Sequence, residues 1–313
     1  MTYSAPGKAE RQGITLIELA EMFPDETAAR EWFESRVWPN GRVCPRCEGE
    51  RTIEASHARM PYWCPACREY FSVRTGTVLE RSKVPLRKWV YAIYLHLTSL
   101  KGVSSMKLYR DIGVSQKTAW FMLQRIREAF DDDGDKPFGG PVEVDETFVG
   151  GLEGNKHEHQ RAKAHGGSPE KDPVIGLKDR ETGRVQARAI EQTDAPTLQG
   201  FVRRHTAPGS KVYSDGHPGY SKLEGDYDHN FVSHSAGTYV IGDIHTNGIE
   251  AFWSMFKRGI VGVYHHVSSK HLDRYAQEFA GRHNLREMDT LAQMGMVASG
   301  MVGKRLTYED LIK

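Results

Sequence analysis

The sequence lacks a long hydrophobic run and a marked excess of charge of either sign. No apolar stretch reaches the roughly 18 residues of a membrane-spanning helix, so we expect no membrane contact. Residues 1–12 lack the apolar core of a secretory signal, and we expect the protein to stay in the compartment where it is made. The formal net charge of +1 excludes a histone-like polycation, although it permits basic patches that acidic ones balance.

Cysteine is also scarce, and all four cysteines lie between positions 44 and 67 of the 313 residues. So tight a cluster is no disulfide scaffold for a chain of this length, and it indicates metal ligands in a reducing cell. One CxxC pair holds Cys44 and Cys47, the second holds Cys64 and Cys67, and the 16 residues 48–63 separate them. This spacing predicts a structural Zn²⁺ held by four thiolates, with no coordination position open for chemistry.

The rest of the composition, 39% hydrophobic and 27% charged, is that of an ordinary soluble protein long enough for two or three domains. Apolar positions at three- and four-residue steps predict a helical lead-in over residues 1–40. A zinc ribbon follows over residues 41–76, and its flanks interleave cations with aromatic residues. Such flanks are typical of a ribbon that contacts nucleic acid, although ribbons also contact proteins.

Residues 84–130 predict three helices, the second capped by Ser104 and the third capped by Ser115 after a turn at Gly113. A tight glycine turn before the last helix is typical of a helix-turn-helix, which places that helix in the major groove of double-stranded DNA. A compact three-helix unit without a ligand is the alternative. The zinc ribbon directly before these helices favours DNA binding. An acidic linker rich in glycine is predicted over residues 131–140.

The segment 141–290 begins with a strand that carries acids on one face. Val142 and Val144 share one face, and Glu143 and Asp145 share the other. Taken alone, this pattern is typical of the wet side of an antiparallel sheet. A cationic loop without periodicity follows over residues 150–173, and we expect it to be a flap that contacts DNA.

Two further acids occupy comparable positions later in the segment. Asp215 ends a strand, where folds with helices on a mixed sheet place ligands. A helix that opens near Asn247 carries Glu250 and Lys257 seven residues apart, hence on one stripe. A tail without a motif is predicted over residues 291–313.

The order of predicted elements, a strand, two hairpin strands, a helix, two strands and a helix, resembles the ribonuclease H-like fold, a mixed α+β or α/β architecture. In that order the three acids Asp145, Asp215 and Glu250 can converge on two divalent cations about 4 Å apart, which suits an in-line displacement at phosphorus. Oxygen ligands of this kind favour Mg²⁺ or Mn²⁺.

At these residues the chain resembles the bacterial insertion-sequence transposases of the DDE type, and among them the group with an N-terminal zinc ribbon that is numbered fifteen-ninety-five. The resemblance rests on the two CxxC pairs and on the segments VEVDETFVGG, VYSDGHPGY, HTNGIEAFWSMFKRG and VYHHVSSKHLDRYAQEFAGRHNLR. It implies an enzyme that binds terminal inverted repeats, cleaves the donor strand with water and joins the freed 3′-hydroxyl to target DNA. It also implies a homodimer or higher oligomer on DNA, in a cytoplasm where the protein associates with the nucleoid.

Asp145, Asp215 and Glu250 are therefore the predicted magnesium ligands. Some members of the group use asparagine at the third position, so Asn247, a helix cap or a ligand, is the alternative to Glu250. We favour Glu250 because a carboxylate binds a hard cation better than an amide does.

Two neighbouring residues, Lys257 and Glu143, receive supporting roles. By the resemblance, Lys257 contacts the DNA backbone, whereas its position alone indicates an exposed helix lysine. Strand alternation turns Glu146 to the opposite face from Asp145, so Glu143 is the expected partner around the site.

Two other functions fit the same residues. A DNA-binding regulator with a transposase-derived scaffold would have lost a catalytic acid, and none is missing here. A ribonuclease H-like DNA nuclease would cleave without strand transfer, which only an assay of joining distinguishes.

Overall fold

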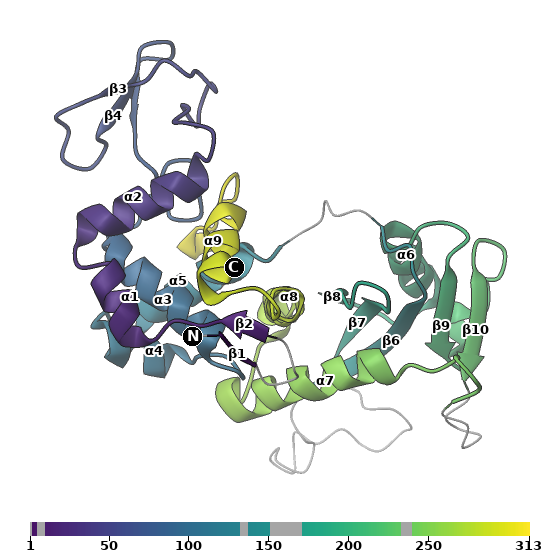
Figure 1. The fold of residues 1–313 in the computed structure, drawn as a ribbon. Coiled ribbons are helices and arrows are strands. Elements are labelled where there is room, and N and C mark those ends of the chain that lie inside the picture. Colours follow the sequence, from purple (N-terminus) through teal and green to yellow (C-terminus); the bar gives the residue numbers. More distant parts are fainter. Residues whose placement is uncertain (1, 5–9, 132–136, 151–170, 233–239) are drawn as a thin grey trace. The chain divides into compact units, whose positions relative to one another are not determined.

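The computed structural model describes residues 2–4, 10–131, 137–150, 171–232 and 240–313. The chain divides into a first unit, Met1–Asp131 with Leu285–Lys313, and a second unit, Asp132–Asn284 (Figure 1). Most of the expected cationic loop and half of the expected acidic linker lie outside the described residues. Within the described residues, no helix has both the length and the apolar character of a membrane span.

Helices form most of the first unit. They are α1 (Leu16–Met22), α2 (Glu26–Val37), α3 (Leu86–Thr98), α4 (Ser105–Ile112), α5 (Gln116–Glu128), α9 (Thr290–Gly300) and α10 (Tyr308–Ile312), with a pair of short antiparallel strands, β1 (Thr2–Ser4) and β2 (Glu10–Gln12). Thr15 and Glu18 form a capping box at α1, and the carboxylate of Asp25 accepts from the N–H of Ala28 to begin α2.

The segment expected as a tail, 291–313, belongs to the core of this unit. Met294, Val297 and Met301 are buried, and α9 packs against α2 and α3. The helix carries no charged residue, and its buried apolar side chains share a core with residues from the other end of the chain. The sequence of residues 291–313 does not indicate which elements these side chains pack against, so the segment was expected to be a tail.

The zinc ribbon is a three-stranded antiparallel sheet in the order β3-β4-β5, formed by β3 (Ile53–Glu54), β4 (Tyr62–Cys64) and β5 (Glu69–Phe71). The aromatic rings of Tyr62 and Phe71 lie 5.7 and 5.9 Å from the ring of Trp38, at the end of α2. These edge contacts join the ribbon to the helical core.

Helices α4 and α5 meet at a tight turn, as their sequence predicts. Ser104 and Ser115 cap them by accepting from the N–H groups of Lys107 and Thr118. Gly113 has φ of 63°, the left-handed conformation that glycine adopts without strain.

A five-stranded sheet in the order β10-β9-β6-β7-β8 organises the second unit. Its strands are β6 (Val142–Val149), β7 (Asp172–Asp179), β8 (Val185–Ala189), β9 (Lys211–Asp215) and β10 (Asp228–Val232). The first three form an antiparallel meander, whereas β9 pairs parallel with β6, and β10 pairs parallel with β9.

Helices cover both faces of this sheet. Helix α6 (Ala195–His205) places Leu198 and Val202 in one core with Val142 and Val144. Helices α7 (Asn247–Gly259) and α8 (Ser269–Asn284) form a second core on the opposite face, where α7 packs against β6 and β7, and α8 packs against β7 and β8. The face of β6 that carries Asp145 is therefore the face that α7 covers.

Candidate functional site

Sheet register brings two of the predicted acids together. Strands β6 and β9 run parallel, with Glu143 opposite Tyr213, so Asp145 and Asp215 stand level two residues further along. The structure adds Glu146, because one carboxylate oxygen from each of Asp145, Glu146 and Asp215 lies within 4.8 Å of the others. Three acids this close can hold a divalent cation.

The pKa values of the acids in the cluster also indicate a site for a cation. Burial, and then the negative charges of Asp215, Glu146 and Glu250, raise the pKa of Asp145 to about 8 from 3.8. Burial is also the main cause of the raised pKa of Glu146. A cation bound among these groups would offset both the desolvation and the mutual repulsion.

Glu250 faces the same cluster from helix α7. It lies exposed in the first turn of that helix, and its charge contributes to the raised pKa of Asp145. Its carboxylate accepts a 2.7 Å hydrogen bond from the hydroxyl of Thr246 and lies outside the 4.8 Å cluster. Asn247 is the exposed first residue of α7, and the N-cap position expected there belongs to Thr246 instead.

Glu143 anchors the start of α7 to the sheet. It is 1% exposed, and its Oε2 accepts from the backbone N–H of Ile249 at 2.8 Å. Its Oε1 accepts from Nε of Arg180 at 2.7 Å, and Arg180 also donates to the carbonyls of Asp243 and His245 just before the helix. The buried carboxylate thereby satisfies a free N–H group at the helix N-terminus and fixes where Glu250 stands.

Two glycines let α7 approach the sheet this closely. Gly176 pairs with Asp145 across the strands, and a Cβ there would lie 2.6 Å from the ring of Trp253. At Gly248 a Cβ would lie 2.7 Å from Oε2 of Glu143. Any larger side chain at either position would push the helix, and the acid it carries, away from Asp145.

Strand alternation predicts that Glu146 points away from the cluster, and this prediction is wrong for its carboxylate. Its Oε2 accepts from the hydroxyl of Tyr220 at 2.7 Å, and Nε2 of His217 lies 3.8 Å from its Oε1. The backbone N–H of His217 donates to Oδ1 of Asp215 at 3.0 Å. The segment VYSDGHPGY thus supplies Asp215 together with two side chains that hold Glu146, a signal that alternation within β6 alone does not contain.

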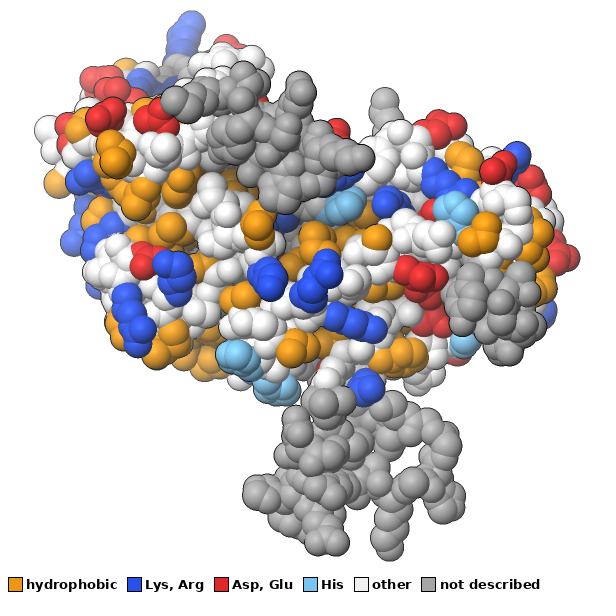
Figure 2. All heavy atoms as spheres, turned by 60° about the horizontal axis from the view of Figure 1, so that its bottom comes forward, with side chains coloured by type: hydrophobic (Ala, Val, Ile, Leu, Met, Phe, Trp, Pro, Cys, Tyr) orange, Lys and Arg blue, Asp and Glu red, His pale blue; other side chains and the backbone are white. Residues whose placement is uncertain are grey.

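Lys257 lies exposed in the last turn of α7, seven residues after Glu250. Figure 2 turns the bottom of Figure 1, where α7 lies, toward the reader and shows acidic and basic side chains exposed on that face. A lysine so placed can reach a phosphate that approaches the acids.

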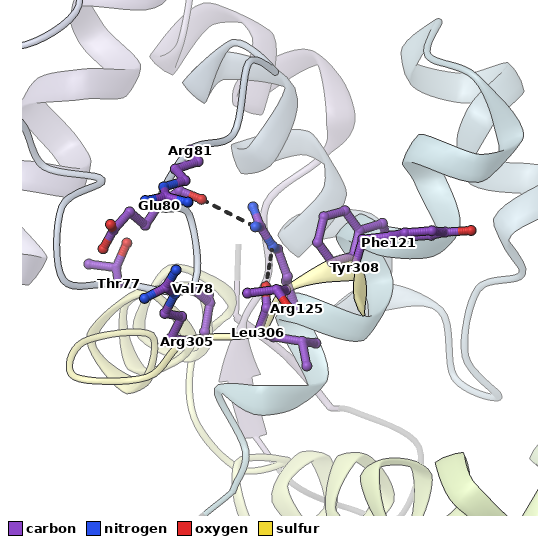
Figure 3. A pocket seen from close by; sticks show the side chains of 10 residues that line it. Thr77, Val78, Glu80, Arg81, Phe121, Arg125, Arg305, Leu306 and Tyr308 are labelled. Carbon is purple, nitrogen blue, oxygen red and sulfur yellow. Dashed lines mark hydrogen bonds between the residues drawn. The ribbon is translucent and has the colours of Figure 1, made fainter. Parts of the chain in front are cut away.

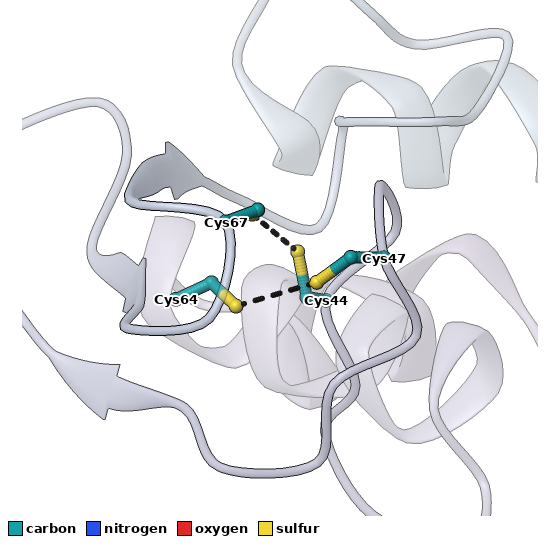
Figure 4. A group of neighbouring side chains, drawn as sticks. All are labelled: Cys44, Cys47, Cys64 and Cys67. Carbon is teal, nitrogen blue, oxygen red and sulfur yellow. Dashed lines mark hydrogen bonds between the residues drawn. The ribbon is translucent and has the colours of Figure 1, made fainter.

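The four cysteines converge as their spacing predicts (Figure 4). Sγ of Cys44 lies 3.6 Å from Sγ of Cys67, and the same distance separates Cys47 from Cys64. A tetrahedron with Zn–S bonds of about 2.3 Å has sulfur–sulfur edges of about 3.8 Å, so the donor set fits zinc. The backbone N–H of Cys67 is the main cause that lowers the pKa of Cys64 to about 7, whereas burial is the main cause that raises the pKa of Cys67 to about 12.

Both knuckles of the ribbon have the same backbone. Glu48 and Arg68 each follow the first cysteine of a pair by four residues, and both have φ of 58°. Their N–H groups donate to the carbonyls of Cys44 and Cys64 at 2.9 and 2.8 Å. The repeated turn directs the sulfurs of both pairs to one point.

Comparisons with known proteins agree with this arrangement. Residues 137–284 match the model of the ISXO2-like transposase domain, and residues 24–74 match that of the transposase zinc-ribbon domain. The chain is 32% identical over 271 residues to a protein of Halobacterium salinarum described as an uncharacterized protein in transposable element ISH50, over 82% of this chain and 90% of that relative. The chain therefore belongs to the insertion-sequence DDE transposases in which a transposase zinc ribbon accompanies an ISXO2-like transposase domain.

Proposed function

We propose that this protein binds the terminal inverted repeats of its insertion sequence, cleaves the donor DNA strand and transfers the freed 3′ end to target DNA. The observation that carries the proposal is the cluster of half-buried carboxylates in the middle of β6 and at the end of β9, in a chain that also carries a four-cysteine zinc ribbon. Family membership supports a DDE transposase, and the strand-transfer step is our extension of it.

The topology of the second unit supports a ribonuclease H-like catalytic domain. Along the sheet the strands read third, second, first, fourth and fifth in chain order, and the second strand runs opposite to its neighbours. This strand order brings the first and fourth strands side by side, and with them Asp145 and Asp215.

Asp145 and Asp215 would hold magnesium or manganese, with Glu250 as the third ligand from α7. Asn247 is the alternative third ligand, and Glu146 is a further candidate because it already lies in the cluster. Metal bound here would activate the attacking oxygen and stabilise the leaving oxygen at phosphorus. The chain's own part is positional, because Glu143 and Arg180 hold the end of α7 that carries Glu250.

The first unit would hold double-stranded DNA. Helix α5 follows a tight turn and exposes Gln116 and Lys117 at its start, as a recognition helix does. Lys257 would contact the backbone near the reacting phosphate. Because a transposition reaction joins two DNA ends, we expect a homodimer or higher oligomer on DNA.

Incubation of the protein with labelled duplex from the ends of its insertion sequence, and with Mg²⁺, tests the proposal. We expect nicking at the end and joined product with the wild type, and neither with Asp145→Ala or Asp215→Ala. Nicking by those variants would refute the ligand assignment. Nicking without joining would identify a nuclease, and sequence-specific binding without nicking would identify a regulator.

The third ligand needs its own comparison. Glu250→Gln, Asn247→Ala and Glu146→Gln each change one candidate, and the variant that abolishes nicking identifies the ligand. Ser254→Ala, at an exposed position of α7 on the same side as Glu250, is the matched control. Loss of nicking activity in that control would show that nicking is sensitive to any change on this surface of α7 and does not identify a metal ligand.

A further inference from the structure

A cavity of about 240 Å³ lies within the first unit, between the turn that follows the zinc ribbon, helix α5 and the segment that leads into α10 (Figure 3). Its charged lining residues are Glu80, Arg81, Arg125 and Arg305. Three arginines against one glutamate give the lining a net positive charge. The volume is below the roughly 300 Å³ of typical small-molecule sites and suits a compact group.

Arg125 is the buried cation of this cavity. It is 7% exposed, and its guanidinium donates to the carbonyls of Leu306 at 3.3 Å and Glu80 at 3.2 Å. Both acceptors are neutral, and among the described residues no carboxylate forms an ion pair with Arg125. Burial lowers the pKa of Arg125 to about 10, which leaves the side chain charged at neutral pH.

The negative charge of Glu80 offsets part of the cost of burying Arg125, but burial has the larger effect on the pKa of Arg125. The carboxylate of Glu80 accepts from the backbone N–H of Gly76 at 3.1 Å, and Figure 3 shows it directed away from Arg125. A buried cation without a paired anion is costly, so the cavity favours an anionic occupant. Arg81 and Arg305 are exposed and can complete the charge around it.

The position of the cavity indicates where the anion comes from. Lys117, Phe121 and Arg125 follow one another at four-residue steps, so they form one stripe along α5. The ring of Tyr308 lies 5.9 Å from that of Phe121, and Nζ of Lys117 lies 4.3 Å from the centre of the Tyr308 ring. Phe121 and Arg125 both line the cavity, so the cavity lies on the stripe that begins at the exposed start of α5.

We infer that this cavity seats one phosphate of the DNA backbone, with Arg125 at its floor and Arg81 and Arg305 at its rim. The inference rests on the proposed function, which places α5 on DNA. Seated there, the phosphate would set the register of α5 along the groove without reading a base. The segment around Arg305, near the C-terminus, then becomes part of the DNA-binding surface.

Arg305→Gln and Arg81→Gln test this, because both side chains are exposed and neither holds the fold. Arg36→Gln removes an exposed charge from α2 in the same unit and is the matched control. Binding of the full chain to end duplex is measured by fluorescence anisotropy without Mg²⁺, over a series of salt concentrations. Each rim variant should bind about tenfold more weakly and reduce the slope of log K against log salt by about 1.

Two further results would mark a phosphate contact. The rim variants should lose the same factor on end duplex and on unrelated duplex, because a phosphate carries no sequence. A scan of neutral methylphosphonate linkages through the end duplex should find one position that weakens the wild type but not Arg305→Gln. Such non-additivity assigns the side chain to that phosphate.

The contrary outcomes separate this inference from the function it rests on. If the wild type binds and nicks end DNA while the rim variants behave as Arg36→Gln does, the inference alone is overturned. If the wild type binds no end DNA, both fail. If inorganic phosphate binds the DNA-free protein, Arg305→Gln abolishes that binding and DNA affinity is unchanged, the cavity serves a free anion and the inference is again overturned.

Discussion

Replacement of Asp145 by asparagine should stabilise the magnesium-free protein, by an amount that grows with pH. The pKa of this carboxyl is about 8 in the folded chain, against an ordinary value of 3.8. Between those values the folded state binds more protons than the unfolded state does, so the free energy of unfolding falls as pH rises. One such group changes it by about 1.4 kcal/mol per pH unit.

Asp145→Asn keeps the shape of the side chain and removes its titration. The difference in unfolding free energy, variant minus wild type, should therefore rise by about 1.4 kcal/mol per pH unit between about pH 5 and pH 7. It should level off above about pH 8, where the carboxyl is ionised in both states. Saturating Mg²⁺ should shrink the difference, because a bound cation stabilises only the ionised wild type.

Urea unfolding of the full chain measures this, with zinc kept bound and pulse hydrogen exchange of β7 peptides used to follow the second unit by itself. Asp194→Asn is the control, since Thr197 lowers the pKa of that exposed cap. A lowered pKa contributes stability above the unfolded pKa and loses it only as pH falls below, so this variant should show no trend between about pH 5 and pH 7. A flat difference for Asp145→Asn over the same range would refute the account of its burial.

Three other changes have expected outcomes. Gly176→Ala should displace α7 from the sheet and slow nicking about 100-fold. Gly200→Ala should leave the nicking rate unchanged, because a Cβ there meets nothing within 4 Å. Equal nicking rates in the two variants would contradict the conclusion that α7 needs a glycine at position 176 to approach the sheet. Cys64→Ser should lower the zinc content measured by atomic absorption and abolish the ordered near-ultraviolet signal of the ribbon aromatics, and full zinc occupancy would speak against a four-thiolate site. Tyr220→Phe removes a hydrogen bond that lowers the pKa of Glu146. In an electron spin resonance titration at neutral pH, Mn²⁺ should therefore bind this variant about fivefold more weakly. An unchanged Mn²⁺ affinity would exclude Glu146 as a metal ligand.

The local part of this structure could be predicted from the sequence. The strand of Asp145, the strand that ends at Asp215 and the helix of Glu250 all appear where their periodicity indicates. The caps at Ser104 and Ser115 and the turn at Gly113 are local as well, because a side chain and its own backbone decide them. The cysteine spacing likewise predicts one point of convergence for four sulfurs, which the structure confirms.

The positions of other side chains depend on residues that are distant in the sequence, which the local sequence pattern does not reveal. Glu146 reaches the acid cluster because Tyr220, 74 positions away, donates to it, and Glu143 anchors α7 because Ile249 is brought to it across the sheet.

The role of the C-terminal segment likewise could not be predicted from its own sequence. Residues 291–313 join the core of the first unit and complete the arginine-lined cavity. By itself, the sequence predicted the type of most elements, although the strands β1 and β2 lie in the segment expected as a helical lead-in. It also predicted the zinc ligands and the acids Asp145, Asp215 and Glu250 as candidates. Only the tertiary structure decided which carboxylates meet and which buried charge lacks an anion, because both depend on side chains that are distant in sequence packing together in a desolvated interior.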